Sequence, residues 1–396
     1  MKKEMNAVIG QSGGPTSVIN SSLAGAITGL KNINKIKNIY GMKFGIEGFL
    51  KSNFINLSLL PEESLTKLKA TPSSALGSSR YKLLEKDFPE ILNILKKNNI
   101  HYFFLIGGND SMDTINRIEQ YCQKNNYELV GIGIPKTVDN DLFGTDHTPG
   151  FASAATYNML SVKQAGILAR NMQKVDKFTI YQTIGRDAGW LAGATALARD
   201  SEKDAPHLIY MPERAFVKEQ FLHDVDNSIS KYGWVSIVCG EGIKYSDGTP
   251  VSNTGVKDQF NNMEFGAMGG TSVAIQLHKM ISKAFNIRGE FQITESLIMC
   301  AIDRASKLDL NEAYSCGLHA SKLALEDISG YMVSIKRISN NPYTVKYSKV
   351  PLKDVAIKAK PMSDSYINKL GNFVSDDFKE YMNPLVENIP EYINLL

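Results

Sequence analysis

Short runs of apolar and β-branched residues recur along the chain, and each run ends in Gly, Pro or an acidic residue. Continuous apolar runs of this length are typical of strands in a parallel sheet that is covered on both faces. The pattern predicts six strands, at Asn6–Ile9, Tyr102–Ile106, Leu129–Ile134, Phe178–Thr183, His207–Met211 and Trp234–Cys239.

Longer segments with the spacing of amphipathic helices lie between these runs. Apolar residues recur every three or four positions in Ser111–Asn125, and Ala215–Tyr232 and Thr271–Phe285 have a similar character. Strands that alternate with helices indicate an α/β fold built on a parallel sheet.

Length and composition narrow the class of protein. The chain has 396 residues, of which 43% are hydrophobic, and this length suits two domains rather than one. A net charge of +3 gives no reason to expect a nucleic acid or a membrane as partner. The N-terminal apolar run is too short for a signal peptide, and no stretch approaches the roughly 18 apolar residues of a membrane span. Four widely spaced cysteines indicate free thiols in a reducing compartment, so we expect a cytoplasmic protein.

Polar and glycine-rich loops follow five of the predicted strands. Since ligands of parallel sheets bind at the carboxyl ends of the strands, these loops are where we expect the functional site. They are GQSGGPTS from Gly10, GGNDS from Gly107, PKTVDND from Pro135, IGRDAGW from Ile184, and Glu241-Gly242.

The first two loops have the composition of anion sites. The glycines at Gly13 and Gly14 would let backbone amides approach a phosphate. The alternative is a plain strand-to-helix turn with Pro15 as the first helical residue. In the second loop, Asp110 could hold magnesium or shape an anion site, whereas the alternative is that Asp110 or Ser111 caps the following helix.

The third loop has the residues that phosphoryl transfer needs. Asp139 or Asp141 could accept a hydroxyl proton while Lys136 neutralises charge on the transferring group, although a polar turn is the simpler alternative. In the fourth loop, Arg186 fits a phosphate or a sugar hydroxyl, unless it only pairs with Asp187. Glu241 in the fifth loop suits sugar hydroxyls.

Together these loops resemble the phosphofructokinase family, in the same order and with compatible spacing, from about Met5 to the end of the chain. The motif PKTVDND is the most specific part. The ATP-dependent branch usually has glycine at the places of Lys136 and Asp110, so lysine and aspartate there resemble the diphosphate-dependent branch. The tail segments GYMVSIKR and NPLVENIPEY are also similar to that branch.

The resemblance implies transfer of phosphate from pyrophosphate to the C1 hydroxyl of fructose 6-phosphate, reversibly, in glycolysis and gluconeogenesis, with Mg²⁺ as cofactor. Asp139 would be the base, Asp141 would support the metal and the charge arrangement, and Lys136 would stabilise the transferring phosphoryl group. The diphosphate would be held by Gly13, Gly14, Arg80, Asp110 and Lys136, with Asn109 at the metal. Asp110 would also occupy the space that the α-phosphate of ATP needs.

The same resemblance implies the acceptor site and the assembly. The substrate would be bound by Thr137, Val138, Asp139, Ile184, Gly185, Arg186 and Glu241. Lys177 and Arg288 would reach the 6-phosphate from a neighbouring subunit, which implies a homodimer or a larger homo-oligomer.

The implied architecture is two doubly wound α/β domains with the active site between them. Residues 1–148, with a return near 291–335, would form the diphosphate-binding domain, and residues 149–290 would form the sugar-phosphate domain. Residues 336–396 would be a C-terminal extension packed on the core.

The chain departs from the family pattern at several positions. The family often has Asp where Asn109 stands, and a methionine where Ile184 stands. The stretch Gly289–Ser306 lacks the expected Gln-Arg pair for the 6-phosphate, Glu295 lies near its place, and Arg304 or Arg288 would have to compensate. Two alternatives follow, an ATP-dependent kinase of the same fold and a non-catalytic regulatory paralogue that binds a sugar phosphate. A dehydrogenase-type nucleotide-binding protein fits less well, because no GxGxxG follows the first strand.

Overall fold

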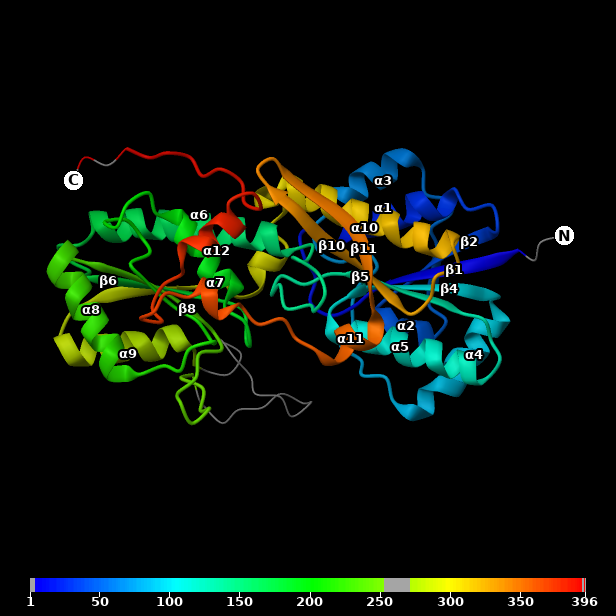
Figure 1. Ribbon diagram of the computed structural model, residues 1–396, viewed down its shortest axis with the longest axis horizontal. Helices are drawn as coiled ribbons and strands as arrows, with labels where there is room; N and C mark the ends of the chain where they lie inside the picture. Colours follow the sequence, from blue (N-terminus) through cyan, green and yellow to red (C-terminus); the bar gives the residue numbers. More distant parts are fainter. Residues whose placement is uncertain (1–3, 253–270, 394, 396) are drawn as a thin grey trace. The chain divides into compact units, whose positions relative to one another are not determined.

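The chain folds into two compact α/β units (Figure 1). The computed structural model describes residues 4–252, 271–393 and 395. Unit 1 comprises Met1–Ser153 and Met299–Lys360, and unit 2 comprises Ala154–Ile298 and Pro361–Leu396. Two α/β units are present, so the predicted fold class is confirmed.

Unit 1 is built on a seven-stranded sheet in the order β11-β10-β5-β4-β1-β2-β3. The five inner strands are parallel, whereas β3 and β11 pair with their neighbours in the antiparallel sense. The strands are β1 (Met5–Gln11), β2 (Ile36–Met42), β3 (Phe54–Asn56), β4 (Ile100–Gly107), β5 (Val130–Pro135), β10 (Tyr331–Asn340) and β11 (Tyr343–Pro351).

Helices cover both faces of this sheet (Figure 1). Because side chains alternate along a strand, Ile9 and Phe104 pack with α1, α3 and α10, whereas Val8 and Phe103 pack with α2, α4, α5 and α11. This is the doubly wound arrangement. The helices are α1 (Ile19–Lys31), α2 (Gly45–Leu50), α3 (Glu62–Lys69), α4 (Phe88–Lys97), α5 (Asn109–Lys124), α10 (Lys307–Leu325) and α11 (Leu352–Ile357).

Unit 2 has a four-stranded, all-parallel sheet in the order β7-β8-β6-β9. One face buries apolar side chains of β6 and β8 against α8 and α9, including Phe178, Val235 and Phe221. The strands are β6 (Phe178–Thr183), β7 (Leu208–Tyr210), β8 (Val235–Gly240) and β9 (Gly289–Ile293), and the helices are α6 (Phe151–Asn171), α7 (Trp190–Ala194), α8 (Lys218–Tyr232), α9 (Val273–Phe285) and α12 (Asp376–Met382).

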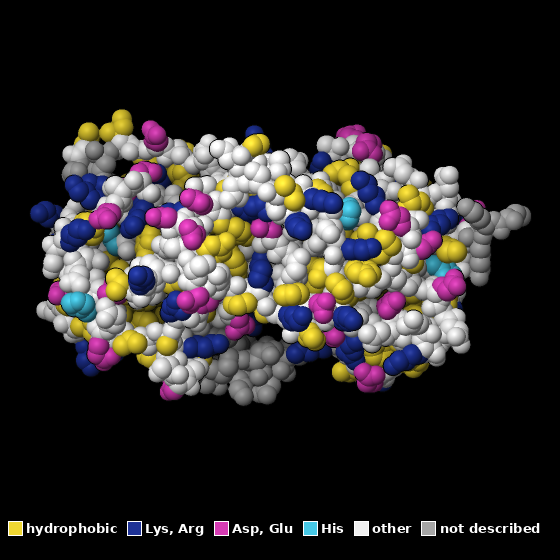
Figure 2. Space-filling model, in the orientation of Figure 1, with side chains coloured by type: hydrophobic (Ala, Val, Ile, Leu, Met, Phe, Trp, Pro, Cys, Tyr) yellow, Lys and Arg dark blue, Asp and Glu magenta, His cyan; other side chains and the backbone are white. Residues whose placement is uncertain are grey.

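All six predicted strands and all three predicted helices are present, with ends shifted by up to three residues. The two tryptophans, Trp190 and Trp234, are core residues, and all four cysteines are free, as expected. On the face that Figure 2 shows, basic and acidic side chains are interspersed, which agrees with the small net charge. None of the helices in the described part of the chain is long and apolar enough to span a membrane.

One alternative and one prediction about the chain's organisation are wrong. Pro15 is not the first helical residue, because α1 begins only at Ile19. Residues 336–396 do not form one extension: β10 and β11 complete the sheet of unit 1, and the chain from Pro361 belongs to unit 2. The place of the hairpin in this sheet could not be recognised from local pattern, since β10 pairs with β5 about 200 residues away in the sequence.

A buried charge network joins the hairpin to the loop after β5. The two ring nitrogens of His147 contact carboxylate oxygens of Asp146 at 2.7 Å and Glu312 at 2.6 Å. Arg337 on β10 donates to the same Asp146 carboxylate at 2.8 Å, and the Tyr343 hydroxyl on β11 donates to Glu312 at 2.7 Å. Burial alone would lower the pKa of His147, but the two carboxylates outweigh burial and raise the pKa to about 9. The imidazolium therefore holds three segments of unit 1 together.

We predict that this network stabilises unit 1 in a pH-dependent way. Since the pKa of His147 is higher in the folded chain than the usual 6.5, its contribution is complete below about pH 6.5 and is lost as the pH rises through about 9. His147→Gln should lower stability at pH 7 by about 3–5 kcal/mol, because it leaves the buried Glu312 carboxylate without its cationic partner and removes a cationic partner from Asp146, which keeps Arg337. The measurement is the thermal unfolding midpoint of both proteins between pH 6 and 10. A gap between them that stays constant over this range would contradict the assignment.

Candidate active site

Three strand-end loops of unit 1 meet at Lys136, which is only 4% exposed. β1, β4 and β5 are adjacent and parallel, so the loops that follow them leave the same edge of the sheet. The ammonium group of Lys136 donates to the carbonyl of Gly14 at 2.7 Å, and its backbone amide donates to Gly107 at 3.1 Å. The loops after β1, β4 and β5 are thus brought together, as the sequence predicts.

The charge of Lys136 is set by its surroundings. Burial lowers its pKa to about 8, Asp139 and Asp141 act in the opposite direction, and Arg80 lowers the pKa further. These interactions place two carboxylates and a guanidinium within electrostatic reach of one ammonium group. Lys136 is still mainly cationic at neutral pH, so it can neutralise charge on a phosphoryl group.

The loop after β1 is shaped to expose backbone amides. Gly13 has a φ of +72°, which favours glycine, and a Cβ there would lie 3.3 Å from the Lys136 ammonium nitrogen. Ser78 and Ser79 hold this residue, through a hydroxyl bond to the Gly13 carbonyl and a bond from the Gly13 amide to the Ser79 carbonyl. The Gly14 amide has no partner among the described residues and is free for an anion. Arg80 follows Ser79 directly and is exposed.

The loop after β4 does not use its polar side chains as helix caps. α5 begins at Asn109, its N-cap is Gly108, and no side chain caps it. The alternative that Asp110 or Ser111 is the N-cap is therefore wrong. Asp110 is exposed in the first helical turn, and the side-chain oxygen of Asn109 is shielded from solvent without a hydrogen-bond partner.

Asp139 and Asp141 flank a tight turn in the loop after β5. Thr137 begins this turn, because its hydroxyl accepts a bond from the Asp139 amide at 3.1 Å. Asn140 is fully buried and has a φ of +56°, in the left-handed region. Val138 is buried, and the two aspartates are half-buried. Both carboxylates act on Lys136, so the third loop has the acid pair and the lysine that the sequence predicts together.

The predicted acceptor residues lie at the carboxyl ends of two strands in unit 2. β6 and β8 are adjacent and parallel, with Thr183 opposite Gly240. The Gly185 amide donates to the Glu241 carboxylate at 3.2 Å, and Gly185 has a φ of +121°. Burial raises the pKa of Glu241, and the bond from Gly185 acts in the opposite direction. Ile184 adjoins this contact and is half-buried.

Arg186 is exposed beside this contact. The alternative that Arg186 pairs with Asp187 is wrong, because the Asp187 carboxylate lies 3.5 Å from Lys244 instead. Gly242 is needed here, since a Cβ would lie 1.7 Å from the Arg186 carbonyl oxygen. The arginine is therefore held by its backbone, and its side chain is available for a ligand.

Lys177 and Arg288 lie at the other end of the strands in this sheet, directly before β6 and β9 begin. Lys177 precedes β6 and its amide donates to the Arg288 carbonyl at 2.8 Å. The Arg288 guanidinium is exposed, 3.5 Å from Asp176. Six residues of strand, about 20 Å, separate this edge from the one with Gly185 and Glu241. Within one unit the structure does not bring these cations to the acceptor residues.

The stretch after β9 brings a carboxylate rather than a cation toward Glu241. Glu295 has a left-handed backbone with a φ of +42°, and its charge contributes to the raised pKa of Glu241. Arg304 is in unit 1 and lies 3.9 Å from the carboxylate of Asp303. Neither position supplies the expected Gln-Arg pair.

Sequence reasoning missed two residues that hold the loop after β5. The Thr148 hydroxyl donates to the Thr137 carbonyl at 2.7 Å, and the ammonium group of Lys360 contacts Asn140 at 3.1 Å. Thr148 could have been suspected from its place after the motif. Lys360 gave no signal, because it follows the motif by more than 200 residues.

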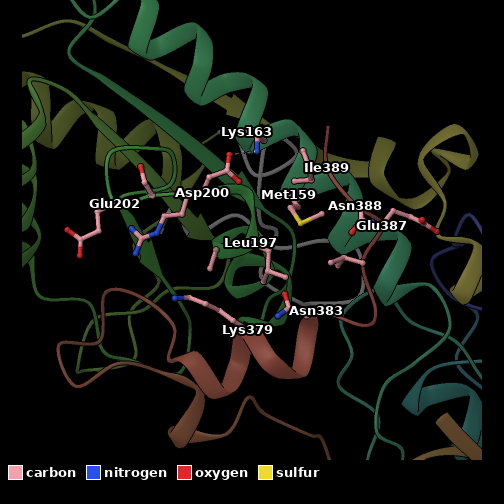
Figure 3. Close-up of a pocket in the computed structure, with 14 residues that line it drawn as sticks. Met159, Lys163, Leu197, Asp200, Glu202, Lys379, Asn383, Glu387, Asn388 and Ile389 are labelled. Atoms are coloured by element: carbon pink, nitrogen blue, oxygen red, sulfur yellow. Dashed lines mark hydrogen bonds and ion pairs between the residues drawn. The ribbon is translucent and has the colours of Figure 1, made fainter. Parts of the chain in front are cut away.

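A cavity of about 560 Å³ in unit 2 was also not predicted (Figure 3). Met159 and Lys163 of α6, Lys379 of α12 and the C-terminal segment that contains Glu387 line it. Its charges are largely paired, as for Lys163 with Asp200 at 2.8 Å and Lys379 with Asp376 at 2.8 Å. The cavity contains none of the residues predicted for the site.

Comparisons with known proteins show the family to which the chain belongs. The phosphofructokinase family model matches residues 6–323. A pyrophosphate–fructose 6-phosphate 1-phosphotransferase of Halomonas elongata is 35% identical over 98% of this chain and 94% of its own. A sulfofructose kinase of Alkalicoccus urumqiensis is 32% identical over 92% of both chains. The crystal structure of pyrophosphate-dependent phosphofructokinase from Marinobacter aquaeolei matches with a TM-score of 0.87 and 33% identity, over 98% of this chain and 94% of that one. On its sequence, its fold and its strand-end loops, the chain belongs to the phosphofructokinase family.

Proposed function

We propose that this protein transfers a phosphoryl group from pyrophosphate to the C1 hydroxyl of fructose 6-phosphate, giving fructose 1,6-bisphosphate and phosphate. The observation that carries the proposal is the buried Lys136 ammonium group bonded to Gly14, with the Asp139 and Asp141 carboxylates in electrostatic reach. The Halomonas elongata relative with this activity in its name supports it. The reaction is reversible, and its place is glycolysis and gluconeogenesis in the cytoplasm.

The predicted site residues of unit 1 have separate roles in this proposal. Asp139 accepts the proton of the C1 hydroxyl as its oxygen attacks the terminal phosphorus of pyrophosphate. The bond from this phosphorus to the bridging oxygen breaks, and inorganic phosphate leaves. Lys136 stabilises the charge of the phosphoryl group in transit, while the Gly14 amide and Arg80 hold the diphosphate.

The residues at the start of α5 fit a magnesium ion. Oxygen ligands are what Mg²⁺ prefers, and the shielded, unpartnered oxygen of Asn109 next to Asp110 is of that kind. No group of three His, Cys, Asp or Glu in the described ranges could hold a metal by itself. Asn109, Asp110 and Asp141 would therefore hold an ion that takes its other ligands from pyrophosphate and water. Bound there, Mg²⁺ neutralises charge on the diphosphate.

The acceptor has its own set of proposed contacts. Thr137 and Val138 contact it near the reacting hydroxyl, and Ile184, Gly185, Arg186 and Glu241 bind the sugar phosphate.

The carboxylate of Glu295 interacts with Glu241 where cations were expected, and a relative is named sulfofructose kinase. Sulfofructose is therefore a second acceptor to test. Turnover of fructose 6-phosphate and of sulfofructose with pyrophosphate compares the two directly. Turnover of sulfofructose alone would overturn the proposed acceptor.

We predict that the wild type uses pyrophosphate and uses ATP poorly. Asp110 puts a carboxylate where the α-phosphate of ATP would lie, and the repulsion between these like charges disfavours ATP. Asp110→Gly should improve ATP use, and Lys136→Gly should damage the pyrophosphate reaction far more than the ATP reaction. Steady-state kinetics with each donor provides the measurement.

Asp113→Gly is the matched control for Asp110→Gly. It puts the same residue into the same helix one turn later, so it shares the cost of a helical glycine and should leave donor preference unchanged. A wild type that prefers ATP would overturn the donor assignment. A wild type that binds sugar phosphate but turns over neither donor would support the non-catalytic paralogue.

Asp139→Ala should lower kcat by roughly 10²–10⁴-fold with little change in substrate binding, because a base acts on the proton only in the transition state. Asp139→Asn keeps the shape and size of the side chain but removes the base, so its kcat should fall by a comparable factor. Stopped-flow or coupled assays give kcat, and equilibrium binding of the sugar phosphate gives the affinity. If either variant keeps near-normal kcat, another group is the base.

We further propose that the protein is a homodimer or a larger homo-oligomer with shared sites. Lys177 and Arg288 lie about 20 Å of strand away from the acceptor residues of their own unit. Leu168 on α6 and Met172 and Val175 in the turn that follows it expose 50%, 42% and 51% of their surface, shortly before Lys177 in the sequence. Exposed apolar side chains near cations that lie far from the acceptor residues of their own unit suit a contact with a second copy.

Mixing an Asp139→Ala chain with a Lys177→Ala chain tests this assembly. Each homo-oligomer should be nearly inactive, whereas hybrids contain sites in which both residues are intact, so activity should return to a measurable fraction of wild type. Hybrids are isolated with two different affinity tags before the assay. Purified hybrids that stay as inactive as the parents would rule out shared sites.

A further inference from the structure

Lys360 connects the C-terminal end of unit 1 to the loop with the two aspartates. Its backbone amide donates to the carbonyl of Asp141 at 2.7 Å, and Ala359 forms an antiparallel bridge with Leu142. The segment therefore runs alongside the loop immediately after Asp139 and Asp141. This contact holds the backbone but leaves the direction of the carboxylates to the turn between them.

The side chain of Lys360 reaches this turn. Its buried ammonium group donates to the side-chain oxygen of Asn140 at 3.1 Å, to the Thr145 carbonyl at 3.2 Å and to the Asp146 carbonyl at 2.6 Å. An ammonium group has three protons, and these three oxygens can accept all of them. One lysine thus fixes both the start and the end of the segment 140–146.

Asn140 is the residue on which the direction of the carboxylates depends. It is fully buried and has a left-handed φ of +56°, a conformation that most residues with a Cβ avoid and that Asn adopts more readily. Asp139 and Asp141 are its direct neighbours, so a change at Asn140 would rotate both. The contact with Lys360 helps to keep Asn140 in this conformation.

The charge of Lys360 acts on the same group of residues. Burial lowers its pKa to about 7, while Asp146 and Asp141 act in the opposite direction. Lys136 also interacts with Asp141. Asp141 therefore interacts electrostatically with two lysines, Lys136 of its own loop and Lys360 at the C-terminal end of unit 1.

We propose that Lys360 is a positioning residue for phosphoryl transfer: it holds the Asn140 turn, and the turn aims Asp139 and Asp141 at the reactants. The proposal rests on the function proposed above. Lys360 does not touch the reacting atoms; it acts through Asn140.

Lys360→Met removes the donors and the charge at similar length, and its expected effect is on turnover. kcat should fall about 10–100-fold, as for a misplaced catalytic group, while KM for both substrates stays within about threefold. Lys360→Arg keeps the charge and several donors and should recover part of the loss. Lys353→Met, on the exposed side of α11, is the matched control and should behave as wild type. A Lys360→Met enzyme with wild-type kcat per folded site would overturn the proposal.

A double-mutant cycle separates positioning from a general loss of stability. Glycine adopts the left-handed conformation without cost, so in an Asn140→Gly background Lys360→Met should cost less than about threefold in kcat. Equal losses in both backgrounds would contradict an action through Asn140. If Lys360→Met does not fold, Asn140→Ala takes its place, because it removes the side-chain acceptor on the turn and disfavours the left-handed conformation; a wild-type kcat for that variant would also contradict the proposal.

Hydrogen exchange tests the turn without any turnover. Backbone amides of residues 137–146 should exchange at least about tenfold faster in Lys360→Met than in wild type, and at the wild-type rate in Lys353→Met. Unchanged exchange in Lys360→Met would overturn the positioning role even in an active enzyme. An inactive wild type with the expected exchange difference would instead overturn the function and leave the Lys360 contact in place.

Discussion

The buried ammonium group of Lys136 is the contact on which the rest of the site in unit 1 depends. A charge removed from water is tolerated only where partners replace the lost solvation. Here the partners are the Gly14 carbonyl at 2.7 Å and the carboxylates of Asp139 and Asp141. Because each partner comes from a loop at a strand end, solvating this one charge also brings the diphosphate loop and the acid pair to the same place.

Backbone conformations that most residues avoid recur at the same positions. Gly13, Asn140 and Gly185 all have φ in the left-handed region, and each adjoins a residue with a proposed role. Such conformations persist only where the surroundings hold them, as Ser78 holds Gly13 and Lys360 holds Asn140. The rigid sheets fix where the loops begin, and these side-chain contacts fix how the loops turn.

The sequence was sufficient for the strands that are buried on both faces, and so for the loops at their ends. β4, β5, β6 and β8 are continuous apolar runs, and such runs can be recognised without any partner. The place of the β10–β11 hairpin in the sheet could not be predicted, because it depends on pairing with β5 and on the network around His147. Neither contact is local in sequence. Lys360 could not be predicted for the same reason. The sequence does not distinguish a helix cap from an anion site at Asp110, because only the backbone conformation shows that Gly108 is the N-cap.

The electrostatics of unit 2 indicate why the proposed reaction would need more than one copy of the chain. An acceptor that is a sugar phosphate brings negative charge to an edge where Glu241 already interacts unfavourably with Glu295 and Asp187. At that edge Arg186 is the cation that acts on Glu241, whereas Lys177 and Arg288 are at the far end of β6. Like charges at close range repel one another unless cations offset them. Cations supplied by a neighbouring subunit would offset that repulsion, so binding of the acceptor and assembly of the protein would be thermodynamically coupled.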